Sequence, residues 1–243
     1  MHLGPHQSPP MTDPNRHLVI AENVLGTEVC PTEFREAAER HGRHFARYLF
    51  AARFARSKRV LDGACGSGYG AAYLATLADF VLGVDLDDKL LHHARSAFAK
   101  PNLEFRKHDL HIPVQRDGPF GLITTFETLE HVGDPRRCLA ALAEALADGG
   151  TLLASVPNGE KELLRGRHKR YHPRQFSAAD FEGLLREQFD DVQLFSQVYR
   201  KGAGHYLRKL SFRTNHPARG YHFHSGLDDG AKTWLAVCRR GTS

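Results

Sequence analysis

The stretch Val60-Leu61-Asp62-Gly63-Ala64-Cys65-Gly66-Ser67-Gly68-Tyr69-Gly70 combines three elements in a few residues. An apolar run ends in Asp62, passes through a glycine-rich turn and opens into the helical stretch 70–77. This order predicts a strand, a tight loop and a helix N-terminus, where free backbone N–H groups attract an anionic or polar ligand. Gly66 and Gly68 have no Cβ, so a ligand can lie directly against the backbone there. Because many α/β proteins carry such a turn, the surrounding segments must distinguish between interpretations.

Strand-like and helix-like segments alternate after this turn. The strand pattern recurs at 59–62, 80–85, 102–106, 120–126, 151–156, 192–197 and 233–239. Helical patterns are found at 33–54, 70–77, 87–99, 135–146 and 178–188. Alternation of this kind predicts an α/β fold in which a mostly parallel sheet carries helices on both faces.

The length and composition predict a single domain. At 243 residues the chain has room for one sizeable core. Residues 1–16 hold four prolines without periodicity, so we expect a disordered tail before one domain at 17–243. Within that domain we expect an N-terminal cap region at 17–56 and substrate-side inserts at 158–175 and 198–231. No apolar run approaches the roughly 20 residues that cross a bilayer. The four cysteines lack disulfide or metal spacing, which predicts a cytoplasmic protein with no membrane partner.

The net charge of +5 is distributed unevenly. Residues 161–174 hold six Lys and Arg against one Glu, and residues 197–227 hold six Lys and Arg and four His with no acid. Two interpretations stay open: solvated basic loops, or attraction to an anionic partner such as a phosphorylated metabolite or nucleic acid.

An acidic residue follows each of the first four predicted strands: Asp62, Asp85, Asp109 and Glu127. In a doubly wound sheet, ligands bind outside the carboxyl ends of the strands. Four acids in succession at these ends favour a binding rim. For Asp85 and Asp109 the structural alternative is a helix N-cap.

These segments resemble the class I S-adenosylmethionine-dependent methyltransferases. The resemblance rests on VLDGACGSG at 60–68, VLGVDLD at 81–87, and FGLITTFETLEHVGDP and LADGGTLLASVPN within 120–158. It implies a Rossmann-like sheet of seven strands in the order 3-2-1-4-5-7-6, with the last strand antiparallel. Ala64 departs from the family pattern, which has glycine there, but the family contact at this place uses the backbone carbonyl. A dinucleotide-binding dehydrogenase would need a closer match to Gly-x-Gly-x-x-Gly and a longer chain.

The same resemblance implies an S-adenosyl-L-methionine site. In the family, the glycine loop holds the methionine part with Asp62 beneath it, the acid matched by Asp85 accepts the ribose hydroxyls, and the acid matched by Asp109 meets the adenine amino group. The other cofactor-binding candidates are Gly63, Ala64, Gly66, Gly68, Leu86, Leu110, Thr125, Arg47 and Tyr48. For Arg47 and Tyr48, plain packing is an open alternative.

The segment Glu127-Thr128-Leu129-Glu130-His131 follows the fourth strand. It is similar to the Glu-x-x-Glu-His of ubiquinone-pathway and small-RNA 2′-O-methyltransferases, which implies catalytic roles for Glu127, Glu130 and His131. Two interpretations stay open. His131 is a general base acting alone, or Glu127, Glu130, His131 and His172 hold a divalent cation such as Mg²⁺.

The wider layout is similar to bacterial enzymes that methylate sugars and secondary metabolites. We therefore expect O-methyl transfer to a hydroxyl of a small polar metabolite, such as a sugar-containing natural product in antibiotic or other secondary metabolite biosynthesis. The open alternatives are a metal-assisted RNA 2′-O-methyltransferase, an N-methyltransferase, and a cofactor-binding regulatory or scaffold protein without turnover. The sequence does not choose between a monomer and a homodimer.

Overall fold

A computed structural model describes residues 32–114, 118–164, 174–199, 221–228 and 230–240. The expected tail at 1–16 and the metal candidate His172 lie outside these described residues, as do half of the expected insert 158–175 and most of the expected insert 198–231. None of the described helices is long and apolar enough to span a membrane.

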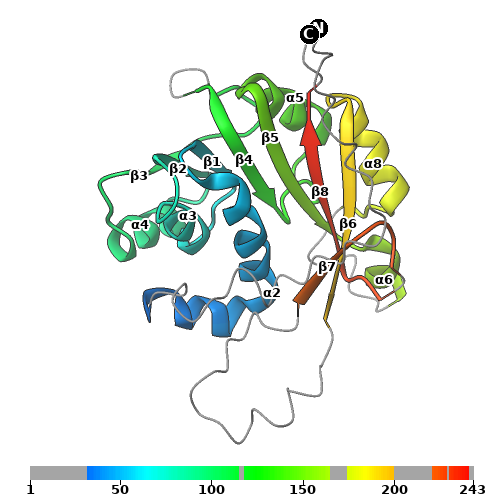
Figure 1. The fold of residues 1–243 in the computed structure, drawn as a ribbon, viewed down its shortest axis with the longest axis horizontal. Coiled ribbons are helices and arrows are strands. Elements are labelled where there is room, and N and C mark those ends of the chain that lie inside the picture. The colour runs from blue at the N-terminus through cyan, green and yellow to red at the C-terminus, as the bar shows by residue number, and fades with distance from the viewer. Residues whose placement is uncertain (1–31, 115–117, 165–173, 200–220, 229, 241–243) are drawn as a thin grey trace, which may run out of the picture.

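The core of the molecule is one eight-stranded sheet (Figure 1). Its strands lie in the order β3-β2-β1-β4-β5-β8-β6-β7. β1 to β5 are parallel, whereas β8 runs antiparallel to both β5 and β6, and β7 is antiparallel to β6. The strands are β1 (Arg59–Gly63), β2 (Phe80–Asp85), β3 (Leu103–Lys107), β4 (Phe120–Phe126), β5 (Leu146–Pro157), β6 (Asp191–Tyr199), β7 (Tyr221–Ser225) and β8 (Thr233–Arg239).

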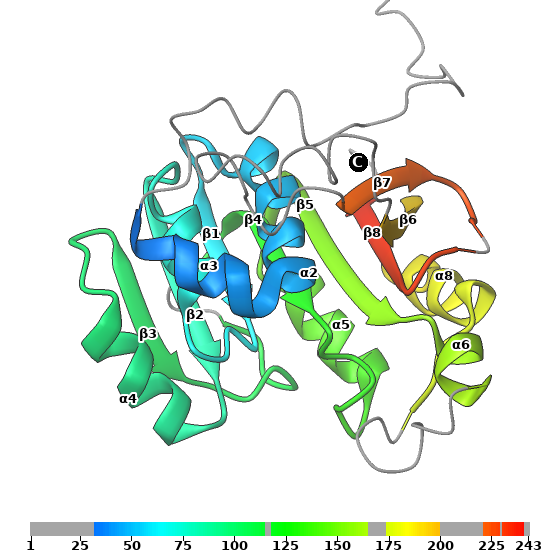
Figure 2. The same cartoon turned by 90° about the horizontal axis from the view of Figure 1, so that it is seen from below.

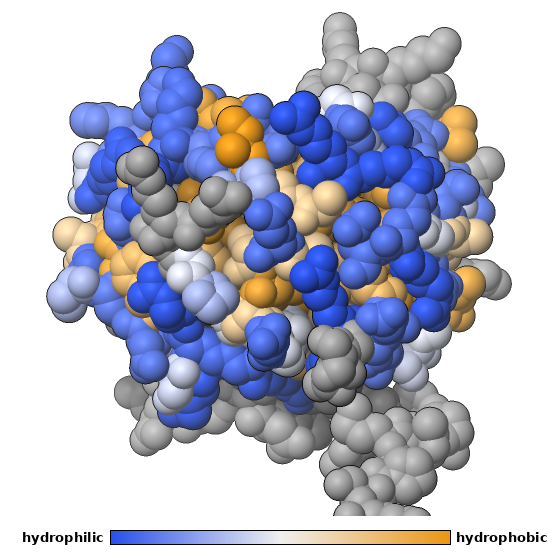
Figure 3. All heavy atoms as spheres, turned by 90° about the horizontal axis from the view of Figure 1, so that it is seen from above, coloured by the Kyte–Doolittle hydropathy of each residue, from blue (hydrophilic) through white to orange (hydrophobic). Residues whose placement is uncertain are grey.

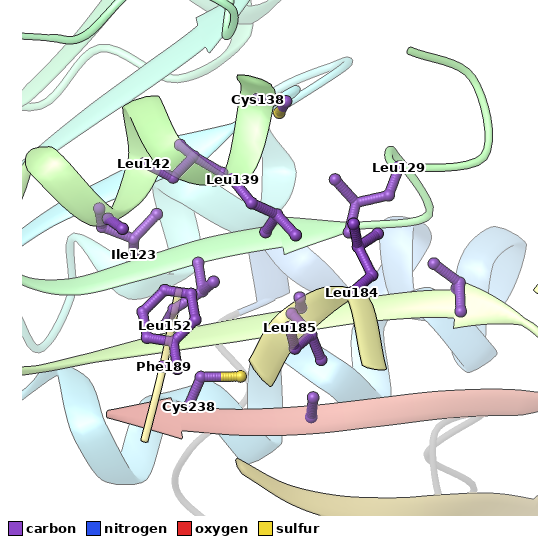
Figure 4. Packing of buried hydrophobic residues seen from close by; sticks show 14 of the residues in the cluster. Ile123, Leu129, Cys138, Leu139, Leu142, Leu152, Leu184, Leu185, Phe189 and Cys238 are labelled. Atoms are coloured by element: carbon purple, nitrogen blue, oxygen red, sulfur yellow. The ribbon is translucent and has the colours of Figure 1, made fainter. Parts of the chain in front are cut away.

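The helices cover both faces of this sheet (Figure 2). They are α2 (Thr32–Ala55), α3 (Tyr69–Leu74), α4 (Asp88–Ala97), α5 (Pro135–Glu144), α6 (Gly159–Leu164) and α8 (Ala178–Arg186). Side chains of α2, α3 and α4 pack in one core cluster with Val60 of β1, whereas those of α5 and α8 pack in the other with Leu61. Adjacent residues of a strand point to opposite faces, so one short apolar run supplies both cores. Figure 4 shows the second core, between α5, α8 and the sheet.

Local sequence signals explain where several helices begin. Asp87 accepts hydrogen bonds from the backbone N–H groups of Lys89 and Leu90 at the start of α4. Asp134 caps α5 in the same way, with Pro135 in the first turn. Ser177 and Asp180 form a capping box at the start of α8. The surface seen in Figure 3 is mostly hydrophilic, with hydrophobic side chains interspersed.

The expected strand order is confirmed, and the differences are additions at the sheet edge and in the inserts. β7 extends the sheet to eight strands, because residues 221–225 pair with β6 inside the expected insert 198–231. α6 occupies the start of the other insert. β5 begins five residues earlier than its pattern predicted, and its Gly149 has a φ of 67°. That positive φ accommodates the Gly149-Gly150 turn inside the strand rather than after a helix. α2 contains a kink at His41.

Candidate functional site

The glycine-rich loop turns sharply after β1. Ala64 has a φ of 59° and Gly66 a φ of 56°, both in the left-handed region. The Cβ of an alanine is sterically unfavourable in that region, whereas glycine has no Cβ, so the backbone of Ala64 is strained. A Cβ at Gly66 would meet nothing within 4 Å, so the loop is open on that side. A Cβ at Gly68 would lie 2.6 Å from Cβ of Ala94.

At Gly68 the space that a side chain would need is occupied, whereas ligand contact with its backbone stays a prediction. The space beside its Cα is filled by α4 and by the ring of Phe105, whose Cζ would be 2.8 Å from an added Cβ. The missing side chain at Gly68 serves helix–strand packing, whereas the open face belongs to Gly66.

Asp62 is fully buried beneath this loop. Its carboxylate accepts hydrogen bonds from the hydroxyl of Thr124 at 2.6 Å and from the hydroxyl of Tyr48 at 3.2 Å. Burial raises the pKa of Asp62 to about 7, although these two hydrogen bonds act in the opposite direction. Tyr48 thus joins α2 to the end of β1. Its hydroxyl is used by Asp62, which supports the packing alternative for this residue.

Asp85 binds the glycine loop directly. Its Oδ2 accepts a hydrogen bond of 2.8 Å from the backbone N–H of Gly66, and its Oδ1 accepts one of 3.0 Å from that of Asp87. Asp87, not Asp85, is the N-cap of α4, so the N-cap alternative for Asp85 is wrong. Asp85 is half-buried at the mouth of the loop, and its carboxylate is held in one orientation.

Asp109 is ordered by the next residues of its own loop. Its Oδ1 accepts hydrogen bonds from the backbone N–H of His111 at 2.9 Å and lies 2.7 Å from the Nδ1 of that ring. These bonds favour the charged form, and the pKa of Asp109 is accordingly below its ordinary value.

A pocket of about 290 Å³ opens between these elements. It brings together the loop residue Ala64 and side chains from the carboxyl ends of β2, β3 and β4. Leu86, on one wall, is 60% exposed although it is a large hydrophobic residue. An apolar side chain left in solvent at a pocket wall is suited to contact a flat ligand ring. The lining residues are Ala64, Asp85, Leu86, His108, Asp109, Leu110, His111, Glu127, Thr128, His131, Val132 and Gly133.

Glu127 connects the pocket to α2. It has a φ of 55°, unusual for a residue with a side chain, and its Oε1 accepts a hydrogen bond of 3.0 Å from Nη1 of Arg47. The Arg47 side chain is completely buried and also donates to Oε1 of Gln197 at 3.3 Å. Its Nε and Nη2 have no hydrogen-bond partner among the described residues. A buried guanidinium with unused donors is costly unless a further acceptor reaches it.

Glu130 and His131 differ sharply in environment. Glu130 is buried, and neither carboxyl oxygen has a hydrogen-bond partner in the part of the chain that the structure describes. Burial, with the neighbouring charge of Glu127 second, raises the pKa of Glu130 well above its usual range and favours its neutral form. The side chain of His131 is 47% exposed, with Nε2 at 3.9 Å from Oε1 of Glu130. His131 thus lines the pocket while Glu130 lies behind it.

The expected metal set does not form at these residues. No group of three His, Cys, Asp or Glu side chains in the described part of the chain is placed to hold a metal ion. The reason is physical: Glu127 is already paired with Arg47, and Glu130 favours its neutral form, whereas a hard cation needs charged oxygen ligands.

Several predicted residues lie near the pocket without lining it. Thr125 is buried in β4, and its hydroxyl has no hydrogen-bond partner. A Cβ at Gly63 would lie 3.2 Å from the Leu110 side chain, so this glycine allows Leu110 to cover the end of β1. Sequence reasoning missed His108, His111 and Thr128 in the pocket wall, although they flank predicted acids. It also missed Gln197, for which the sequence offered no signal.

Comparisons with known proteins agree with this geometry. A family model described as a methyltransferase domain matches residues 34–194. The chain is 28% identical over 197 residues to a "Probable S-adenosylmethionine-dependent methyltransferase" of Mycolicibacterium smegmatis, covering 80% of this chain and 75% of that protein. A ubiquinone biosynthesis O-methyltransferase of Aromatoleum aromaticum is 35% identical over 104 residues, which are 42% of this chain and 44% of that protein.

Solved structures show the same fold. An S-adenosylmethionine-dependent methyltransferase of Mesorhizobium loti has a TM-score of 0.58 at 19% identity, covering 81% of this chain and 100% of that one. A TehB-like S-adenosylmethionine-dependent methyltransferase of Corynebacterium glutamicum has a TM-score of 0.56 at 20% identity, covering 86% and 94%. Because the family match covers more than half of its length, the chain belongs to the methyltransferase domain family and is a class I S-adenosylmethionine-dependent methyltransferase.

Proposed function

We propose that this chain transfers a methyl group from S-adenosyl-L-methionine to a hydroxyl of a small polar metabolite. The observation that carries the proposal is the single pocket in which Asp85, Asp109 and the end of the glycine loop meet Glu127 and His131. One wall suits a nucleoside, and the other places an acid and an imidazole where an acceptor would enter. The partial likeness to ubiquinone biosynthesis O-methyltransferases supports oxygen as the accepting atom.

The residues present fit the cofactor. Asp85 is held by two backbone N–H groups with its carboxylate at the pocket, so it can accept two ribose hydroxyls in a charge-assisted arrangement. Leu86 and Leu110 supply apolar surface for an adenine ring, with Asp109 beside it. The unused donors of Arg47 are suited to a carboxylate. When bound, the sulfonium supplies an already activated methyl group.

The chain's own task is then to align the acceptor and remove its proton. Alignment of two reactants in one pocket contributes several kcal/mol of the barrier. His131 is the residue we assign as general base, because it is the imidazole of the Glu127–His131 segment and is exposed to the pocket. Glu127 and Glu130 position this segment: one is tied to Arg47 and the other lies buried behind the ring. No step through a divalent cation is needed or proposed.

The test combines cofactor binding with turnover. Calorimetry with S-adenosylhomocysteine should show binding to the wild-type chain. His131→Ala should leave that affinity unchanged and lower kcat on any accepted hydroxyl substrate by about 10²–10⁴-fold, the usual contribution of a general base. Prolonged chelation should leave wild-type turnover intact. An unaffected kcat in His131→Ala would show that His131 has a structural role and is not the general base. Loss of activity on chelation, with recovery on adding Mg²⁺, would instead support the metal-assisted interpretation.

A further inference from the structure

Two arginines of α2, Arg43 and Arg47, are outside the lining of the pocket. Arg43 and Arg47 are four residues apart, so their side chains are neighbours on the helix surface. The amide of Gln197 on β6 links this turn to the sheet: its Nε2 donates to the backbone carbonyl of Arg43 at 2.8 Å, and its Oε1 accepts from Arg47. Figure 1 shows α2 and β7 at the same end of the sheet, the end toward which β4 points.

The two arginines differ in how their charge is compensated. Arg47 is paired with Glu127, which also lines the pocket. Arg43 is half-buried, and its guanidinium has no hydrogen bond or ion pair with any described residue. The neighbouring His44 adds no further positive charge. Burial, followed by the charges of Arg47, Arg43 and His41, lowers the pKa of His44 to about 2, which keeps its ring neutral. Within the described part of the chain, the positive charge of Arg43 is therefore left without an ion-pair partner.

An aromatic pair lies beside this charge. Tyr199 at the end of β6 is directly opposite Tyr221 at the start of β7, with ring centroids 5.0 Å apart. Tyr199 is two residues beyond Gln197 on β6, so both side chains are on the sheet face where Gln197 binds the backbone carbonyl of Arg43. Burial raises the pKa of Tyr221, and the positive charge of Arg43 is the largest effect in the opposite direction. Tyr199 is 39% exposed and offers an open ring face. A half-buried cation without a partner next to an exposed ring is suited to an acid group on a cyclic molecule.

Resting on the proposed function, we infer that the methyl acceptor carries an oxyanion, a carboxylate or a phosphate ester, which Arg43 binds beside the Tyr199–Tyr221 ring pair. Arg47, one helical turn from Arg43, is paired with Glu127 of the pocket wall, so the proposed anion position is on the Glu127 side of the pocket. One turn of helix, about 5.4 Å, separates the two arginines along the axis. The guanidinium of Arg43 can bind either oxyanion with two parallel hydrogen bonds. The positive charge of Arg43 then selects a negatively charged acceptor by a contact that is separate from the methyl-transfer position.

The experiment measures binding to the full chain saturated with S-adenosylhomocysteine. Calorimetry compares three matched pairs of compounds: glucuronate with glucose, glucose 6-phosphate with glucose, and 3,4-dihydroxybenzoate with 3,4-dihydroxybenzamide. At least one anionic member should bind ten-fold or more tightly than its neutral partner. Preference in the first or third pair assigns a carboxylate, and preference in the second assigns a phosphate.

Two variants separate a specific site from general charge. Arg43→Gln should abolish the anion preference while S-adenosylhomocysteine affinity stays at the wild-type value. Arg40→Gln is the matched control, because Arg40 is on the same helix but exposed and paired with Glu36. The inference is overturned if no anionic compound binds better than its neutral partner, or if Arg40→Gln lowers the preference as much as Arg43→Gln. Absence of S-adenosylhomocysteine binding would instead overturn the proposed function, so the two failures are distinct.

Discussion

At the scale of single residues, Asp85 and Asp87 have different roles although they are two positions apart. Asp85 holds the glycine loop and faces the pocket, whereas Asp87 caps α4. Asp85→Ala should weaken S-adenosylhomocysteine binding by about 1–3 kcal/mol, the effect of losing hydrogen bonds to a charged group. Asp87→Ala should lower the free energy of unfolding by about 1 kcal/mol with little change in affinity. Calorimetry and urea unfolding of both variants check this, and equal affinity losses would contradict it.

The buried carboxyl of Asp62 makes stability depend on pH. Because its pKa is about 7 in the fold and about 3.9 in an unfolded chain, the folded state retains a proton that the unfolded state has lost. Its contribution is therefore most favourable below pH 4 and decreases as pH rises to about 7, by at most ~1.4 kcal/mol per pH unit. Asp62→Asn should remove this slope. Urea unfolding of both proteins between pH 4 and 8 measures it, and parallel pH curves would refute the raised pKa.

At the scale of elements, the contact between α2 and α3 depends on a glycine. A Cβ at Gly70 would lie 2.0 Å from Cζ of Tyr48, the residue that binds Asp62. Gly70→Ala should therefore displace the Tyr48 ring and lower the free energy of unfolding by about 1–3 kcal/mol. Gly183→Ala in α8 is the control, since nothing lies within 4 Å of its added Cβ. That variant should gain up to about 1 kcal/mol from helix propensity. Urea midpoints of the two variants should shift in opposite directions.

The sequence predicted elements best where a local signal marked their ends. Asp134-Pro135 and Ser177 begin α5 and α8 as expected, because caps are encoded by the residues that make them. β7 was missed because residues 221–225 are a strand only through pairing with β6, a partner more than 20 residues earlier in the chain. The start of β5 was missed for the same reason. Its first residue, Leu146, pairs with Phe120 although Gly149 and Gly150 interrupt the pattern.

At the scale of the whole molecule, the site is assembled from four segments between residues 64 and 133. Ala64, Asp85, Asp109 and His131 lie at or just after the carboxyl ends of four strands and meet only because β1 to β4 end at one edge of the sheet. A ligand that bridges these loops should stabilise the entire fold. S-adenosylhomocysteine at 100 times its Kd should raise the free energy of unfolding by about 2.7 kcal/mol. Thermal unfolding with and without the ligand measures this, and adenosine alone, with fewer contacts, should give less protection at the same concentration.

By itself, the sequence determined the fold class and the order of acids along the pocket edge, and its resemblance to class I methyltransferases implied the strand order. Apolar alternation, glycines and caps are local signals, and parallel strands place their carboxyl ends together. Only the tertiary structure decided which charges meet. The pairing of Arg47 with Glu127, 80 residues apart, and the burial of Glu130 depend on how α2 packs against β4 and β6. The same packing leaves the Arg43 guanidinium without an ion-pair partner among the described residues. The charge state of a side chain and its preference for a ligand depend on its burial and on its contacts. Both are set by residues that are distant in the sequence, so local sequence patterns do not predict them.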